Sequence, residues 1–420
     1  MSARVTNWAG SIRFGAQRFH RPASLAELQQ LVAASERVRA LGTGHSFNRI
    51  ADTPDDLVSV AGLPRTMAID EERSTVSVSA GMRYGELAGF LNDRGHALPN
   101  LGSLPHISVA GACATGTHGS GISNGVLATS VAAIELVTPD GDLAVLSRER
   151  DGEQFCGAVV GLGSVGIVTS LTLDIVPAFT MRQFVYEDMP RGQFEENFAE
   201  IFASAYSVSA FIDWRGASVK QIWLKRRVEA EQWASEPDWL GARLADGPRH
   251  MIPGMPAANC TEQLGTPGPW NTRLPHFRLE YTPSSGTEIQ SEYLVPAGAG
   301  PDALAALDDL RGRLAPLVQI SEIRTVAQDD LWMSPCYRRD TVAIHFTWIP
   351  DTPAVEALLP AIEDRLAPFA PRPHWGKLFT LDPDAVRAEC HRLADFQQLL
   401  GHFDPAGKFR NEFIDRYIAG

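Results

Sequence analysis

Hydrophobic residues recur along the C-terminal half of the chain with the periods of strands and helices in turn. Apolar and polar residues alternate in the predicted strands, whereas apolar residues recur every three or four positions in the predicted helices. Thr352 is expected to cap the second helix, because Pro353 suits its first position. The order β-α-β-β-α-β predicts a ferredoxin-like unit, with helices on one face of an antiparallel sheet. Its elements are strand 289–295, helix 302–314, strand 320–326, strand 341–348, helix 353–366 and strand 374–380.

The N-terminal part has shorter elements in a less regular order. Ser24 and Glu27 form a capping box that opens a helix to about Ser35. A Pro-Asp-Gly turn at 139–141 predicts a hairpin. This mixture indicates the α+β class rather than a regular βα alternation. The other expected elements are strands 38–41, 57–60, 65–69, 75–79, 131–138, 143–146 and 167–175 and a helix at 84–93.

The composition is that of a folded protein long enough for two domains. Hydrophobic residues make up 44% and charged residues 21% of the 420 residues. The net charge of -13 argues against nucleic acid and anionic membranes as partners, because both require a basic face. No apolar run is long enough to span a bilayer, and the N-terminus lacks the apolar core of a signal peptide. Five scattered cysteines without ligand spacing indicate reduced thiols, so we expect a cytoplasmic protein with no metal site.

Polar side chains gather on one face of the predicted C-terminal strands. His345 and Thr347 point away from the apolar face of their strand, and Glu322 and Arg324 share a face of another. On the strand 289–295, Gln290 and Glu292 share a face. This set is consistent with a binding site, and equally with the solvated outer face that antiparallel sheets often have.

Two glycine-rich stretches are candidates for a phosphate cradle. Gly42-Thr43-Gly44 follows a short strand, where the backbone can turn and present unpaired amides, and His45 lies at the tip. The alternative is a surface turn with an incidental histidine. The second stretch, 102–121, holds five glycines, which are useful where backbone must approach a ligand closely; the alternative is a flexible linker.

A third glycine motif, GLGSVG at 161–166, matches GxGxxG. A dinucleotide fingerprint requires a strand before it and a helix after it. Here a β-branched, alternating segment follows, so the motif does not predict a Rossmann fold.

Six short motifs are spread along the chain, and the first follows Pro22, Ser24, a helix and a strand. The motifs are GTGHSFN (42–48), SLPHISVAG (103–111), EIRTV (322–326), DTVAIHFTW (340–348), RPHWGK (372–377) and FDPAGKFRN (403–411). Together they resemble bacterial alditol oxidases of the vanillyl-alcohol-oxidase family, and the segment 22–46 is similar to the start of that family. Two of the motifs, RPHWGK and FDPAGKFRN, are shared with the sugar-lactone oxidases.

The resemblance implies a two-domain FAD-binding (PCMH-type) α+β fold whose cap domain is built on an antiparallel sheet covered by helices. With the composition shift near Pro177, the expected parts are an FAD-binding domain at 1–177, a cap at 178–380 and a segment at 381–420 that returns to the first domain. FAD would be covalently attached through His45. The implied cofactor residues are Leu41, Gly42, Thr43, Gly44, His45, Ser46, Asn48, Ser103, Ser108, Gly111, Cys113, Thr115, Gly116, Thr117, His118, Gly119, Gly166, Ile167, Val168, His374 and Asn411.

The implied reaction is oxidation of the terminal hydroxyl of an open-chain polyol, such as xylitol or sorbitol, to the aldose. Hydride would pass to FAD, and O2 would reoxidise the flavin to give H2O2. The expected partners are therefore a small polyol and O2, and we expect a monomer. The implied substrate residues are Ser103, Gln290, Glu322, Arg324, His345, Thr347 and Lys377, of which Glu322, Arg324, His345 and Lys377 are also catalytic candidates.

His345 is the expected general base, because imidazole is the one neutral base near pH 7 in this set. Lys377 is the rival base if Arg324 lowers its pKa. Otherwise Arg324 and Lys377 supply positive charge to the alkoxide, and Glu322 orients Arg324. Gly102 leaves room for O2 to approach. The alternatives are a sugar-lactone oxidase, a binding protein on a degenerate flavin fold, and a pyridine-nucleotide dehydrogenase that uses GLGSVG.

Overall fold

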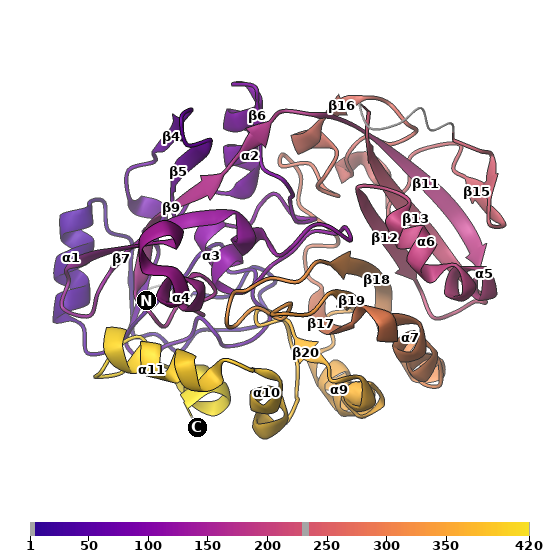
Figure 1. Cartoon of the computed structure of the whole chain (residues 1–420). Coiled ribbons are helices and arrows are strands. Elements are labelled where there is room, and N and C mark those ends of the chain that lie inside the picture. Colours follow the sequence, from indigo (N-terminus) through magenta and orange to yellow (C-terminus); the bar gives the residue numbers. More distant parts are fainter. Residues whose placement is uncertain (1–4, 229–234, 420) are drawn as a thin grey trace.

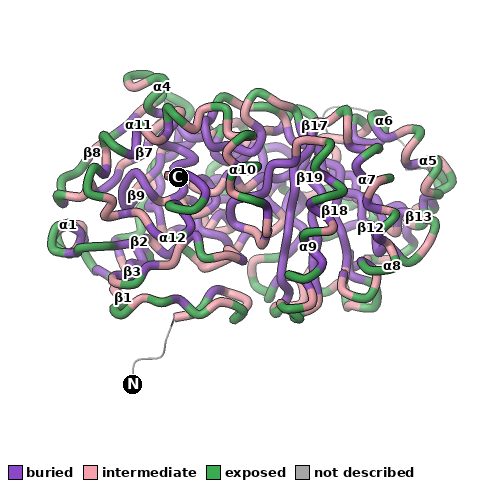
Figure 2. Tube along the Cα trace, turned by 90° about the horizontal axis from the view of Figure 1, so that it is seen from below, coloured by how far each residue is buried: buried purple, intermediate pink, exposed green. Residues whose placement is uncertain are grey.

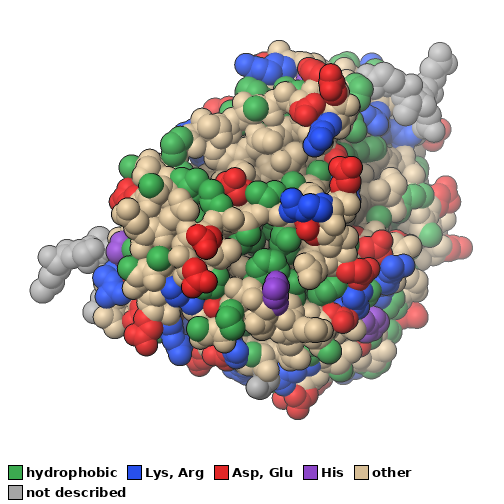
Figure 3. All heavy atoms as spheres, turned by 60° about the vertical axis from the view of Figure 1, so that its left-hand side comes forward, with side chains coloured by type: hydrophobic (Ala, Val, Ile, Leu, Met, Phe, Trp, Pro, Cys, Tyr) green, Lys and Arg blue, Asp and Glu red, His purple; other side chains and the backbone are tan. Residues whose placement is uncertain are grey.

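The computed structural model describes residues 5–228 and 235–419, which form an α+β structure with a ten-stranded sheet, a five-stranded sheet and two smaller sheets of three and two strands (Figure 1). The N-terminal elements surround a small antiparallel sheet, and a larger sheet lies beside them. Within the described residues, no helix is both long and apolar enough to cross a bilayer. On the face in Figure 3, acidic and basic side chains are interspersed.

The N-terminal sheet confirms the predicted hairpin and its flanking strands. Gly141 in the turn has φ +84°, a conformation that glycine adopts without strain. Ser24 Oγ accepts the Glu27 amide at 3.2 Å and caps helix α1 (Leu25–Ala34), which begins directly after Ser24. Among the described residues the five-stranded order is β4 (Met67–Asp70), β5 (Thr75–Ser79), β9 (Ile167–Asp174), β7 (Val131–Val137) and β8 (Leu143–Ser147). Three parallel strands, β1 (Arg18–His20), β3 (Asp56–Val58) and β2 (Val38–Ala40), pair beside it, with helices α1 (Leu25–Ala34), α2 (Tyr84–Asn92), α3 (Val109–Ala114) and α4 (Arg148–Val159).

The large sheet joins two units of the same strand order. The second unit is the predicted one: β17 (Ile289–Pro296), α7 (Gly300–Asp308), β18 (Val318–Val326), β19 (Thr341–Trp348), α9 (Thr352–Leu366) and β20 (Arg372–Pro373). Its spatial order is β18-β19-β17-β20. The first unit, which the sequence did not predict, has the order β15-β11-β13-β12 from β11 (Thr180–Pro190), α5 (Arg191–Glu196), α6 (Phe198–Ala203), β12 (Ser207–Ile212), β13 (Ser218–Arg227) and β15 (Ala242–Leu244). Antiparallel pairing of β12 with β18 places Phe211 opposite Glu322 and joins the units.

Three details of the predicted unit are wrong. The last strand is Arg372–Pro373, because the chain turns at His374, whose Nδ1 accepts the Gly376 amide at 3.0 Å. The first helix is interrupted at Asp309, since Leu310 bonds back to the Leu307 carbonyl and a second short helix, α8 (Arg311–Leu314), follows. The second helix is capped by Asp351 rather than Thr352, because the Asp351 carboxylate accepts the Ala354 amide at 3.1 Å.

Both faces of the second unit's central strands are buried. Every residue of β19 is buried, as Figure 2 shows in purple for these strands, so the solvated-face alternative is wrong. On one face of β19 the rings of Phe346 and Trp348 are stacked, with their centroids 4.9 Å apart. His345 and Thr347 occupy the other face, which therefore looks into the interior of the molecule.

The C-terminal segment contacts the N-terminal elements. The Lys408 carbonyl accepts the Val38 amide at 3.0 Å, and Lys408 Nζ donates to the carbonyls of Val32 and Pro139. In Figure 1, helix α11 (Leu393–Phe403, yellow) lies below α4. These contacts support the expected return of residues 381–420, but the domain limits themselves remain a proposal.

Candidate functional site

One cavity runs between the glycine-rich loops of the N-terminal elements and the polar face of β17, β18 and β19. Its N-terminal end is lined by the loop 41–46, by α3 and by Gly163 and Gly166. Its other end is lined by the sheet, by 102–104 and by 374–377. The segments that the sequence singled out separately therefore meet around one space.

The loop 42–46 is a cradle of free backbone amides. Among the described residues, no protein acceptor takes the N–H groups of 42–46. Thr43 Oγ1 accepts the Ser108 amide at 3.2 Å, which joins this loop to the start of α3. A Cβ at Gly42 would lie 2.4 Å from Ser108 Oγ, and one at Gly111 would lie 2.8 Å from it. Such a close, amide-rich junction suits a bound pyrophosphate.

His45 lines the cavity as a neutral ring. It stacks on Trp8 with centroids 4.9 Å apart, and its Nδ1 lies 3.1 Å from Thr43 Oγ1. Its Nε2 is buried with no hydrogen-bond partner among the described residues. Burial, together with the charge of Lys377, lowers the pKa of His45 to about 3.

Arg39, which the sequence reading missed, fixes the loop after α4. Its buried guanidinium donates to the carbonyls of Leu162 and Gly163 at 2.8 Å and to that of Phe409 at 2.7 Å. Burial lowers the pKa of Arg39 to about 10, which leaves it charged at neutral pH. The loop lies between helix α4 and strand β9, the reverse of a Rossmann arrangement, so the GxGxxG match is no dinucleotide fingerprint.

Most of the expected cofactor residues line the cavity. They are Leu41, Gly42, Thr43, Gly44, His45, Ser46, Ser103, Ser108, Gly111, Thr115, Thr117, His118, Gly166, Val168 and His374. Six others do not line it: Asn48, Cys113, Gly116, Gly119, Ile167 and Asn411.

These six residues support the cavity wall from behind. Asn48 donates to the carbonyls of Trp375 and Lys377, and Asn411 donates to those of Ile50 and Asp52. The thiol of Cys113 lies 3.3 Å from the Tyr84 hydroxyl, and Ile167 lies in the core. Gly116 and Gly119 approach the Pro335 ring and the Leu101 carbonyl so closely that a Cβ would clash.

The seven expected substrate residues all line the other end of the cavity. Pairing of β17 with β19 places Gln290 opposite Thr347 and Glu292 opposite His345. Pairing of β18 with β19 places Glu322 on the other side of His345. Glu292, whose place on this face the alternation indicated, belongs to the wall although it was not among the expected site residues. The lining residues are Ser103, Gln290, Glu292, Glu322, Arg324, His345, Thr347 and Lys377, with His276 beside them.

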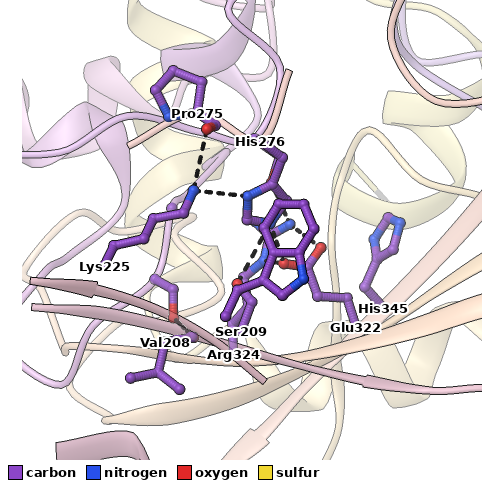
Figure 4. Close-up of polar contacts among 12 residues, drawn as sticks. Val208, Ser209, Lys225, Pro275, His276, Glu322, Arg324 and His345 are labelled. Carbon is purple, nitrogen blue, oxygen red and sulfur yellow. Dashed lines mark hydrogen bonds and ion pairs between the residues drawn. The ribbon is translucent and has the colours of Figure 1, made fainter. Parts of the chain in front are cut away.

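Glu322 and Arg324 form a buried ion pair. Arg324 Nε donates to Glu322 Oε1 at 2.6 Å, and an NH2 group of Arg324 also donates to Ser103 Oγ at 2.5 Å. His276 Nε2 lies 2.7 Å from the same carboxylate, as Figure 4 shows. Burial opposes ionisation of Glu322, but the charge of Arg324 and the hydrogen bonds from His276 and Arg324 hold the pKa of Glu322 well below its usual range.

Glu292 lies between two imidazoles. Its Oε2 is 3.3 Å from His345 Nδ1, and its Oε1 is 3.1 Å from His118 Nε2. Burial again opposes ionisation, yet the two histidines hold the pKa of Glu292 well below its usual range. Burial lowers the pKa of His345 although Glu292 opposes this, so His345 is neutral near pH 7.

Lys377 enters from the turn after β20. Its Nζ donates to Gln290 Oε1 and lies 5.0 Å from the centre of the Phe47 ring. Burial lowers its pKa to about 8, and Arg324 contributes less to this shift than burial does. The expectation that Arg324 would lower this pKa is therefore correct in direction, but Arg324 is not the principal cause.

Comparisons with known proteins agree with this architecture. A family model for an FAD binding domain matches residues 16–147, and one for D-arabinono-1,4-lactone oxidase matches residues 286–417. An alditol oxidase of a Streptomyces species is 50% identical, with all of both chains covered. L-gulono-1,4-lactone dehydrogenase of Mycobacterium tuberculosis is 28% identical over all of both chains, and L-gulonolactone oxidase of Mus musculus is 25% identical over 98% of this chain and 97% of its own.

The fold is shared with a more distant enzyme. Cholesterol oxidase from B. sterolicum superposes with a TM-score of 0.80 at 14% identity, covering 99% of this chain and 96% of the other. The residues present fit FAD, because the region matched by the FAD model contains the amides of 42–46 and His45 Nε2, none of which has a partner in the part of the chain that the structure describes. The chain therefore belongs to the alditol oxidase family of FAD-dependent oxidoreductases, with the sugar-lactone oxidases as more distant relatives.

Proposed function

We propose that this protein is an alditol oxidase that converts the terminal hydroxyl of open-chain polyols, such as xylitol and sorbitol, to the aldose. The observation that carries the proposal is the density of hydrogen-bonding groups on the inner face of β17, β18 and β19. Bound FAD supplies a hydride acceptor that O2 can reoxidise with release of H2O2. The remaining chemistry falls to side chains of this chain.

The polar wall matches the needs of a polyol. Every carbon of an alditol carries a hydroxyl, and each hydroxyl left unpaired on burial costs about 1–3 kcal/mol. Ser103, Gln290, Glu322, Arg324 and Thr347 offer both donors and acceptors along the wall. An apolar alcohol would leave most of these groups unsatisfied, so the wall selects against it.

His345 is the proposed general base. A carboxylate beside Nδ1 favours the tautomer with the proton on Nδ1, so Nε2 keeps its lone pair, with Thr347 Oγ1 3.4 Å away. That lone pair can accept the hydroxyl proton of the substrate. Arg324 and Lys377 place positive charge around the developing alkoxide, and Glu322 holds the Arg324 guanidinium in place.

His45 is the proposed covalent attachment point for FAD. Its ring is neutral, lines the cavity and has one nitrogen without a partner among the described residues. A neutral imidazole nitrogen is the form that can make a carbon–nitrogen bond. Trp8 restricts the ring by stacking on it, which keeps it oriented for attachment.

The expected monomer, cytoplasmic location and domain limits belong to the same proposal. All five cysteines are free thiols, which is consistent with a reducing compartment. The contacts of 404–411 with the N-terminal elements support a C-terminal segment that completes the FAD-binding domain. Gel filtration and limited proteolysis test these points.

An aldonolactone oxidase is the second candidate, because the model that matches 286–417 is that of D-arabinono-1,4-lactone oxidase. Peroxide formation with xylitol, sorbitol, L-gulono-1,4-lactone and D-arabinono-1,4-lactone separates the two. We expect kcat/KM to be higher for both alditols than for either lactone. The reverse order would assign the chain to the lactone branch.

A further inference from the structure

A buried lysine that the proposed reaction does not use lies behind the polar wall. Lys225 belongs to β13, and its side chain is 1% exposed. Its Nζ donates to the Leu274 carbonyl, to the Pro275 carbonyl at 3.2 Å and to His276 Nδ1 at 2.8 Å. Figure 4 shows Lys225, His276 and Glu322 in a row that leads to Arg324.

The partners of this row determine where its protons lie. Glu322 is paired with Arg324 and is therefore a carboxylate, which only accepts hydrogen bonds. His276 Nε2, 2.7 Å from Glu322 Oε1, must then carry the proton of the ring. His276 Nδ1 is left as an acceptor, so Lys225 must donate to it.

Three acceptors around Lys225 require three protons. Two are carbonyl oxygens and the third is His276 Nδ1, so an ammonium ion satisfies all three with every N–H used, whereas a neutral amine satisfies Nδ1 and one carbonyl. Burial, with a smaller contribution from the charge of Arg324, lowers the pKa of Lys225 well below its usual range, although the Glu322 carboxylate opposes this shift. In either protonation state the amine can donate to His276 Nδ1. The opposite arrangement, with a neutral Lys225 accepting from Nδ1–H, would set the Nε2 lone pair against a carboxylate oxygen.

The surroundings hold the ring in this position. Trp223 lies edge-on to the His276 ring with centroids 5.0 Å apart, and Phe211 does so at 5.8 Å. The His276 amide donates to the Ser103 carbonyl at 3.0 Å, and Ser103 is itself the partner of Arg324. The hydroxyl of Ser209 lies farther from Nε2, at 3.5 Å.

We propose that Lys225 and His276 are positioning residues of the substrate wall: Lys225 fixes the Nε2–H tautomer of His276, and His276 then holds Glu322 against Arg324. Lys225 does not line the cavity, whereas His276 does, so Lys225 acts on the substrate wall through His276. The consequence for turnover rests on the proposed alditol oxidation, whereas the tautomer does not.

The first test reads the tautomer. In protein labelled with ¹⁵N-histidine, with the His276 signals assigned through His276→Gln, we expect proton attachment at Nε2 and an unprotonated, hydrogen-bonded Nδ1. Lys225→Met should change the Nδ1 shift, and Lys220→Met should not, because Lys220 on the same strand pairs with Asp188 at the surface. A wild-type ring protonated on Nδ1, or His276 signals unchanged in Lys225→Met, would overturn the proposal.

The second test measures turnover of xylitol. Loss of one buried, charge-assisted hydrogen bond predicts a fall of about tenfold to a hundredfold in kcat/KM for Lys225→Met. His276→Gln keeps an acceptor for Lys225 and a donor for Glu322, so it should retain most activity, whereas His276→Phe should not. On the His276→Phe background, Lys225→Met should cost less than about threefold, because the two residues act in series.

Equal losses from Lys225→Met on both backgrounds would contradict action through His276. If Lys225→Met does not fold, the wild-type tautomer and the contrast between His276→Gln and His276→Phe decide the proposal. A wild-type enzyme that oxidises no alditol would remove the proposed function, and the tautomer measurement would still decide the role of Lys225.

Discussion

Glu292 and His345 face each other on neighbouring strands, with Glu292 Oε2 3.3 Å from His345 Nδ1. The antiparallel register of β17 and β19 fixes this pair directly, so the imidazole is oriented by the sheet itself. The carboxylate favours the ring proton on Nδ1 and leaves Nε2 unprotonated, as the proposed role of base requires. The proposed catalytic role of His345 therefore depends on Glu292, which lies on the neighbouring strand β17.

Replacing Glu292 by Gln removes the charge and keeps the side-chain size. We expect the rate of flavin reduction by xylitol to fall by about tenfold or more, because the amide can hold the wrong tautomer. Anaerobic stopped-flow spectroscopy measures this rate. Glu356→Gln, an exposed change on α9, is the control and should leave the rate unchanged; a normal rate in Glu292→Gln would remove the orienting role.

His345→Ala should have a larger effect on the same step. Loss of a general base predicts a fall of about 10²–10⁴-fold in the reduction rate, with flavin content unchanged. The ratio of flavin to protein absorbance checks the content. A near-normal reduction rate in this variant would show that a group other than His345 is the general base.

The pH dependence of kcat/KM distinguishes the two roles of Lys377. Its pKa of about 8 means that the amine is charged below that pH and neutral above it. If the ammonium stabilises the alkoxide, activity falls as the pH rises through about 8; if the amine is the base, activity rises there. A profile measured with xylitol should show the fall, and Lys377→Met should abolish that limb.

Gly102→Val tests whether this glycine keeps a path open for O2. A Cβ at Gly102 would lie 3.6 Å from the His118 carbonyl, an ordinary contact, so the backbone accepts a small side chain. We expect reoxidation to slow by about tenfold, with reduction changed by less than about twofold. Gly102→Ala should be intermediate. Equal slowing of both half-reactions would refute a specific effect on O2.

Arg39→Leu should destabilise the fold and not merely the site. The guanidinium donates to carbonyls from 50, 162, 163 and 409. Its loss leaves the carbonyls of Gly163 and Phe409 without a protein donor among the described residues, whereas Asn411 still donates to Ile50. We expect the free energy of unfolding to fall by about 3–5 kcal/mol. Urea denaturation measures this, with the exposed Arg37→Leu as control. A change within about 0.5 kcal/mol would show that water replaces the guanidinium.

His45→Ala tests the covalent link. Acid precipitation of the wild type should leave the yellow colour in the pellet, and precipitation of the variant should release any bound FAD to the supernatant. Release of all flavin from the wild type would contradict attachment through His45, while FAD binding itself would stand on the family match.

The sequence predicted the second unit of the large sheet because its strands alternate. His345, Thr347, Glu322 and Arg324 were assigned to one face by position alone, and the structure puts that face on the cavity. The first unit was missed because β12 is buried at every position, so no alternation marks it.

The missed site residues have partners far away in the chain. Arg39 lies in a short apolar strand and bonds to Phe409, and Lys225 bonds to a segment about fifty residues later that has no regular secondary structure. No local period reveals such contacts, because buried charges are explained only by the groups that the fold brings to them. Glu292 is different. The alternation of its strand predicted its place on the cavity face, but not its contacts with His345 and His118.

The most direct measurement of the central claim is the absorbance spectrum of the purified protein mixed anaerobically with xylitol. We expect the flavin band to bleach and readmitted air to restore it with one equivalent of H2O2 per flavin. A band that no alditol bleaches, while an aldonolactone bleaches it fully, would show that the protein is not an alditol oxidase.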